Sequence, residues 1–306
     1  MDALYSVLAY VAIIVIGQGL RLADAFPRDG VRPISTLILN VTLPCSIIVF
    51  LSGIELSAEL FAPFFAGLAA NWIVAIAAFL ITARAAAEPG MSWLKPFSIL
   101  NMSGYNVGTF AMPFTMGVLP PSSFVAVCLF DAGNSVMVTG GTYAVVTNKE
   151  KGALLRRIAG VLRRLATVPA IWTYVFVMVL AALRWTLPDP ILDFCRIVGA
   201  ANPFLSMLMI GLSINLRLDW KKLRPLLGLI VWRVAINAAL AVGVYFLVPI
   251  AEGLRFACVL ALMAPMPVMG LIFSMKAKLD HEAAANLNSA SVVVSVCIMT
   301  ALIALR

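Results

Sequence analysis

The sequence is short of charge and of histidine. Only 12% of its 306 residues are charged, His281 is its single histidine, and 62% of its residues are hydrophobic. A soluble globular domain carries about 25% charged residues, so this composition, with a mean hydropathy of +1.02, excludes an ordinary soluble fold. The sequence therefore predicts an all-α polytopic membrane protein.

Patterns typical of metal, redox or nucleotide sites are also missing. The five cysteines form no CxxC pair, and we interpret them as buried apolar thiols. The lone histidine has no neighbours for a metal site, so we expect no metal and no cofactor. The chain lacks a GxxxxGK[ST] phosphate loop and the Ser/His, metal or paired-carboxylate sets of membrane enzymes. It is therefore predicted to be neither an enzyme nor, alone, an ATP-driven pump.

Long apolar runs are abundant, and each approaches the roughly 20 residues that span a bilayer. The first run has no Lys or Arg before it and no small-residue cleavage pattern after it, which favours a retained span over a signal peptide. The runs predict ten spans, at residues 3–21, 34–54, 60–83, 94–117, 122–147, 167–187, 191–214, 223–250, 254–275 and 283–305.

Lys and Arg are distributed unevenly between alternate connections. Most of the 22 lie in the odd-numbered connections, few lie on the opposite side, and Arg233 falls inside a span. Basic residues concentrate on the cytoplasmic side, so both termini are expected outside a cell (inner) membrane. The net charge of +8 then needs no nucleic-acid partner.

The longest connection separates five predicted spans from five. The predicted domains are therefore residues 1–147, a basic cytoplasmic linker at 148–166, and residues 167–306. Because five is odd, the second half enters the membrane inverted, which predicts a 5+5 inverted repeat. Matching prolines support the repeat, since they interrupt the second and fourth span of each half: Pro44, Pro113, Pro203, Pro265 and Pro267.

The fourth and ninth spans are the most interrupted. Proline and glycine free backbone groups that cannot face lipid, so these groups must face protein or a water-filled cavity. Paired interrupted spans in inverted halves are typical of a secondary-transporter site, where half-helix N-termini suit an anion. The alternative is close helix packing through Gly104-x-x-x-Gly108.

Amides beside these interruptions are the candidate ligands for an anion. Asn106 leads because its amide N–H groups could hold a carboxylate beside free backbone N–H groups. For each amide, an interhelical hydrogen bond is the structural alternative. The candidate substrate-binding residues are Asn101, Gly104, Tyr105, Asn106, Gly108, Pro267, Asn286 and Asn288.

Asp131 is the one acidic residue deep in a predicted span. An intramembrane carboxylate is expensive, which makes it a functional candidate by default. Either it carries protons, or it is a structural partner of Asn134 or of Arg233. The sequence leaves both readings open.

Three stretches resemble the auxin efflux carrier family of transporters, especially its bacterial members. They are residues 105–113 (YNVGTFAMP), residues 130–134 (FDAGN) and residues 266–295. The family usually has Gly where this chain has Ala111, which predicts a shifted or milder helix break. The resemblance runs nearly end to end.

The resemblance implies ten spans, broken fourth and ninth helices that cross near the midplane, and an elevator-like motion. It implies carboxylate substrates such as malonate, malate or auxin, with proton coupling allowed. A sodium-coupled organic-anion symporter of the related bile-acid type is the alternative, and a channel is the less favoured third reading. The expected partners are a small organic anion, the lipid bilayer and protons or sodium; a homodimer is left open.

Overall fold

A computed structural model of the chain describes residues 2–25, 31–55, 57–146, 163, 166–167, 169–214 and 219–306. Throughout these residues the regular structure is helical, without strands. Among the described residues, seven helices are long and apolar enough to cross a membrane. The all-α prediction is confirmed, and the long apolar helices indicate a membrane-embedded protein.

Each of these seven helices coincides with a predicted span. Of the other predicted spans, 94–117 and 254–275 are interrupted helices, and 167–187 contains a helix of 14 residues, α10 (Pro169–Ala182). The predicted linker 148–166 lies outside the described residues, except for 163 and 166. The seven helices are Tyr5–Leu22, Val31–Leu51, Ala58–Ala83, Pro121–Thr139, Asp189–Ser213, Trp220–Leu247 and His281–Ala304.

The helical path up to residue 146 contains α-helices with short π and 3-10 segments. In order these are α1 (Asp2–Leu22), α2 (Val31–Leu37), η1 (Ile38–Thr42), α3 (Leu43–Leu51), η2 (Ala58–Leu60), α4 (Phe61–Ala83), η3 (Ala85–Ala87), α5 (Leu94–Met102), η4 (Val107–Ala111), α6 (Met112–Met116), α7 (Pro121–Val136), η5 (Met137–Gly141) and α8 (Thr142–Val146).

The helical path from residue 169 onward is built in the same way. In order it contains α10 (Pro169–Ala182), α11 (Asp189–Ala200), α12 (Asn202–Ser213), α13 (Trp220–Leu223), η6 (Arg224–Leu226), α14 (Leu227–Leu247), α15 (Glu252–Leu262), α16 (Val268–Lys276) and α17 (His281–Ala304).

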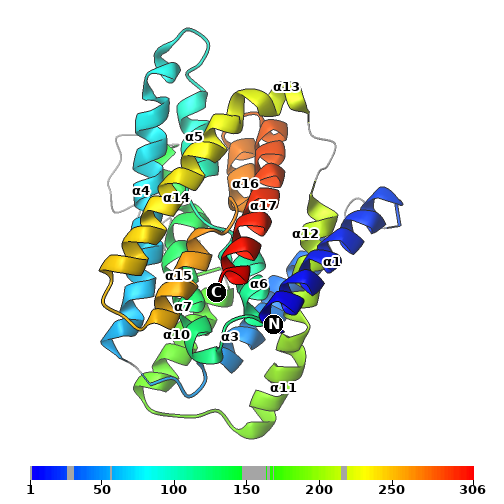
Figure 1. Cartoon of the computed structure of the whole chain (residues 1–306), viewed down its shortest axis with the longest axis vertical. Helices are drawn as coiled ribbons and strands as arrows, with labels where there is room; N and C mark the ends of the chain where they lie inside the picture. Colours follow the sequence, from blue (N-terminus) through cyan, green and yellow to red (C-terminus); the bar gives the residue numbers. More distant parts are fainter. Residues whose placement is uncertain are drawn as a thin grey trace.

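The helices pack in two groups. In the first group α1 packs on α12, and α3 packs on α10 and α11. In the second group α4 packs on α5 and α7, and α15 packs on α7 and α14. Helix α16 of the second group packs on α5 and α17. Figure 1 shows α1 and α12 on one flank and α4 and α14 on the other. The groups meet where α6 lies on α12, where α17 lies on α1, and where α7 lies on α3 and α10.

The outer surface of α4 shows why these helices suit lipid. Phe61, Phe65, Ile76 and Phe79 are all exposed although they are apolar, and they come from one long helix. An apolar face of this size in water marks an interaction or membrane surface. Inside the second group the same helix buries Gly67 and Asn71.

Three of the five prolines predicted to break helices do not break them. Pro113 lies in the first turn of α6, inside the continuous helix Val107–Met116, and Pro203 lies in the first turn of α12. Pro44 follows a π-helical segment within a helix that continues from residue 31 to 51. Pro203 is tolerated because a proline in the first turn of α12 lacks an N–H that would be unpaired there anyway, whereas Pro44 and Pro113 each lie just after a π-helical segment of a helix that continues. Pro265 and Pro267 do lie between α15 and α16.

Glycines set the closest approach between α4 and α7. A Cβ on Gly67 would stand 2.2 Å from the carbonyl oxygen of Phe130, and a Cβ on Gly133 would stand 2.1 Å from that of Phe64. Both distances are shorter than any van der Waals contact, so only glycine permits this packing. The reciprocal pair holds together the helices that carry Asn71, Asp131 and Asn134.

We predict that Gly133→Ala destabilises the protein, because over-packing a tight contact costs about 1–3 kcal/mol. The midpoint of thermal unfolding in detergent should fall. Gly243→Ala on α14 is the matched control, since nothing lies within 4 Å of its added Cβ. That control should leave the midpoint unchanged or raise it; equal losses in both variants would contradict the packing argument.

Candidate functional site

The first helix break lies at residues 103–106. Helix α5 ends at Met102, Ser103 is extended, and Gly104 has a positive φ of 88°. This φ favours glycine because an L side chain there is strained. The helix resumes at Val107 as the π-helix η4 and continues into α6. The break therefore precedes the predicted position at Pro113, and residue 111 lies in the π-helical segment.

The second break lies at residues 263–267. Helix α15 ends at Leu262, and α16 begins at Val268 with Pro267 as its extended N-cap residue. Neither Pro265 nor Pro267 has a backbone N–H to donate, so a regular helix cannot run through this segment. Two of the predicted spans are thus interrupted helices, each broken near its middle.

The two breaks lie directly against each other. The backbone N–H of Asn106 donates to the carbonyl oxygen of Pro265 at 2.9 Å. A Cβ on Gly104 would stand 3.0 Å from Cγ of Pro267. The helices beside the breaks also touch, because the side-chain amide of Asn101 donates to Oγ of Ser274 at 2.9 Å. These contacts form the crossing, defined here as residues 101–109 and 263–270.

A polar clamp fixes the first break. Asn134 accepts from the backbone N–H of Tyr105 at 3.0 Å and donates to the carbonyl oxygen of Tyr105 at 2.8 Å. One side chain from α7 therefore satisfies both backbone groups of Tyr105, in the middle of the break. The predicted substrate-binding residue Tyr105 is buried, and its hydroxyl donates to Asn237 at 2.8 Å.

A matching clamp fixes the second break. The backbone N–H of Met266 donates to Oγ of Ser291 at 3.1 Å, and Asn288 donates to the carbonyl oxygen of Met266 at 2.7 Å. The predicted ligand Asn288 thus has a structural partner. Asn286 is buried, and no hydrogen bond of its side chain is found among the described residues.

Arg233 of α14 lies against the C-terminal ends of α5 and α15. Its guanidinium donates to the carbonyl oxygens of Met102 and Gly104, the latter at 2.8 Å. A third bond, at 3.3 Å, goes to the carbonyl oxygen of Ala264. The side chain is 3% exposed, and its Cζ lies 4.7 Å from the centre of the Tyr105 ring. A buried cation is thus held by backbone carbonyls and an aromatic face.

Asp131 does not pair with Arg233 in the described part of the chain. Its carboxylate accepts from Asn134 at 3.2 Å and from the hydroxyl of Tyr174 at 3.2 Å. It also lies beside the first break, since a Cβ on Gly108 would stand 3.3 Å from Oδ2. Of the two structural partners that the sequence allowed, Asp131 thus contacts Asn134, with Tyr174 as a further partner, and a proton-carrying role stays a prediction.

Asn106 has free donor capacity at the crossing. Its side-chain oxygen accepts from the hydroxyl of Thr109, and no partner for its side-chain N–H groups is found among the described residues. The residue is partly exposed, as are Gly108 and Thr109. Its amide is therefore available to a ligand at the start of the helix Val107–Met116.

Sequence reasoning missed several polar residues at the crossing. Their partners come from segments far apart in the chain, so no local pattern indicates them. The oxygens of Asn71 (Oδ1) and Ser103 (Oγ) are buried and without a hydrogen-bond partner in the described structure. The missed residues are Asn71, Ser103, Tyr174, Asn237, Ser274 and Ser291.

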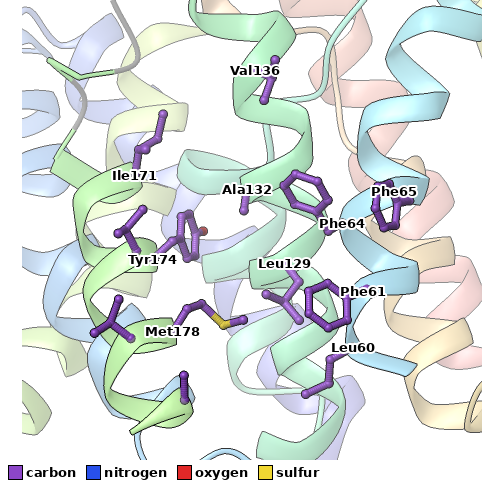
Figure 2. A pocket seen from close by; sticks show the side chains of 13 residues that line it. Leu60, Phe61, Phe64, Phe65, Leu129, Ala132, Val136, Ile171, Tyr174 and Met178 are labelled. Carbon is purple, nitrogen blue, oxygen red and sulfur yellow. The ribbon is translucent and has the colours of Figure 1, made fainter. Parts of the chain in front are cut away.

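A separate pocket of about 610 Å³ lies between α4, α7 and α10. Figure 2 shows Phe64 and Phe61 on one side and Ile171, Tyr174 and Met178 on the other. All thirteen lining residues except Tyr174 have wholly hydrophobic side chains. The lining suits lipid tails and has no group that would hold a carboxylate.

Within the described residues, no group of three His, Cys, Asp or Glu side chains could hold a metal ion. No protein-family model matches the chain, and no curated protein matches it either. The geometry of the crossing is therefore the feature of the molecule that indicates a function.

We predict that Asn134→Ala lowers stability, because it leaves two buried backbone groups unpaired, and each such group costs about 1–3 kcal/mol. Thermal unfolding in detergent measures the loss. Asn40→Ala is the matched control, since Asn40 is exposed and donates only to Thr36 within its own helix. Equal midpoints for the two variants would show that the clamp is dispensable.

Proposed function

We propose that the protein is a secondary transporter of a small organic anion. The observation that carries this proposal is the crossing of two broken helices with a free amide, Asn106, at its open side. Irregular backbone at membrane depth is tolerated only where protein or a water-filled cavity satisfies it. Paired breaks of this kind are the usual location of transporter binding sites.

The charge of the site favours an anion. The helices Val107–Met116 and α16 (Val268–Lys276) both begin at the crossing, and helix N-termini carry partial positive charge. Buried Arg233 offsets the partial negative charge of the C-terminal ends of α5 and α15 close by. A carboxylate could accept hydrogen bonds from free backbone N–H groups and from the Asn106 amide. Malonate, malate and auxin-like acids fit this chemistry.

We propose ten spans in a 5+5 inverted repeat, with residues 1–147 and 167–306 as the halves. The two clamps support the repeat, because Asn134 on α7 and the pair Asn288 and Ser291 on α17 hold equivalent backbone positions. The connection between α4 and α5 also lies at the same end of the molecule as α13, whereas α11 begins at the opposite end (Figure 1). This alternation supports extracytoplasmic termini in a cell membrane.

The two helix groups support an elevator-like mechanism. The crossing belongs to the second group, and the helices of the first group contact it mainly through α6 and α7. The hydrogen bond from Tyr174 on α10 to Asp131 on α7 joins the groups. Movement of the second group against the first would carry the bound anion and would have to break this bond. Together with the sequence resemblance, these features support membership of the auxin efflux carrier family.

A sodium-coupled organic-anion symporter is the second candidate. The unpartnered buried oxygens of Asn71 and Ser103 favour it, because hard cations bind oxygen ligands. Arg233 opposes it, since a fixed positive charge already lies against the neighbouring carbonyls.

We predict that proteoliposomes take up radiolabelled malonate and that Asn106→Ala abolishes most of this uptake. The lost amide bond to a charged ligand is worth about 1.5–3 kcal/mol, so uptake at low malonate should fall at least tenfold. Asn40→Ala is the control and should transport normally. Uptake that is unchanged in Asn106→Ala would place the substrate elsewhere.

We predict that Asp131→Asn separates proton coupling from transport. If Asp131 carries the proton, wild-type uptake should rise with an inward proton gradient, and the variant should lose this response while keeping gradient-free uptake. Both proteins are measured with the gradient imposed and then collapsed by an ionophore. A variant that still responds to the gradient would exclude Asp131 as the proton carrier.

A further inference from the structure

The crossing brings two helix C-termini to one buried cation. Each helix terminus carries about half an elementary charge, so the C-terminal ends of α5 and α15 together present about one negative charge. The guanidinium of Arg233 supplies one positive charge, and it forms no ion pair with a carboxylate in the described structure. The charges of the helix ends and the guanidinium therefore balance.

The ligands of Arg233 resemble those of a metal cation. Three carbonyl oxygens, those of Met102, Gly104 and Ala264, converge from two separate breaks. Convergent backbone carbonyls are the groups with which proteins replace the hydration shell of an alkali cation. Here the guanidinium occupies the point at which they converge, and the ring of Tyr105 covers one of its faces.

We propose that Arg233 is a built-in counter-ion, which takes the position that a coupling cation would fill, so that the site binds its anion without sodium. The part about the anion rests on the proposed function, whereas the part about the cation does not. The N-terminal end of Val107–Met116 faces the Asp131 carboxylate beside Gly108, whereas the N-terminal end of α16 begins at the crossing with the Asn106 amide nearby. An anion at the crossing would therefore meet the N-terminal end of α16 and the Asn106 amide with no co-bound metal ion.

The cation part is tested by thermal unfolding of purified protein in detergent, followed by tryptophan fluorescence in choline, sodium or dilute guanidinium chloride. Wild-type protein should have the same midpoint in choline and sodium. Arg233→Ala should have a lower midpoint in choline, and dilute guanidinium or sodium should restore at least half of the loss, because either ion can enter the vacated carbonyl site.

Arg255→Ala is the matched control. Arg255 also lies over a tyrosine ring and donates to a backbone carbonyl, that of Tyr245, but it lies away from the crossing. Its variant should not be restored by either ion. Arg233→Lys keeps the charge and should remain indifferent to sodium, which provides a second variant if Arg233→Ala does not fold.

A wild-type midpoint that rises in sodium over choline would overturn the proposal, because it would show a vacant sodium site beside Asn71 and Ser103. The proposal would also be overturned if the Arg233→Ala midpoint falls but responds to neither ion, or if sodium raises the midpoint of Arg233→Lys.

Malonate uptake with choline in place of sodium tests the anion part separately. Unchanged uptake is expected, and a tenfold fall would contradict this part of the proposal. If malonate is not transported at all, the proposed function fails while the unfolding result still stands.

Discussion

The structure depends on one constraint, which is that backbone groups released inside an apolar bundle must find partners. At residues 103–106 and 263–267 the chain gives up its helical hydrogen bonds at a depth where an unpaired group costs several kcal/mol. Asn134 pairs with the N–H and C=O of Tyr105, and Ser291 and Asn288 pair with the N–H and C=O of Met266. The remaining carbonyls at the helix ends meet Arg233.

The same constraint explains the small and cyclic residues at the crossing. Gly104 permits a left-handed backbone turn where Pro267 of the other break lies close, and Gly270 lies so near α5 that a Cβ would stand 2.8 Å from the carbonyl oxygen of Leu100. Proline at 265 and 267 leaves fewer N–H groups to satisfy. The glycines at the crossing therefore serve both purposes considered for them, since they allow the helix to break and they allow the neighbouring helix to pack closely.

Much of the fold could be predicted from the sequence because apolar length and Gly/Pro punctuation are local signals. Seven of the predicted spans appear as long apolar helices in the described residues, and the helices predicted to be interrupted, at 94–117 and 254–275, are interrupted. Pro44, Pro113 and Pro203 were misjudged, because a first-turn proline or one after a π-helical turn does not end a helix. The partners of Arg233 and the role of Ser291 depend on tertiary contacts, which no local pattern encodes.

The central claim is that the crossing binds a carboxylate using charge that the chain itself supplies. Equilibrium dialysis of radiolabelled malonate against purified protein in sodium-free choline buffer tests this claim most directly. Saturable binding is expected, and it should be displaced by unlabelled malate and unchanged when sodium is added. Binding that appears only with sodium would contradict the claim, because the site would then need an external cation beside Arg233.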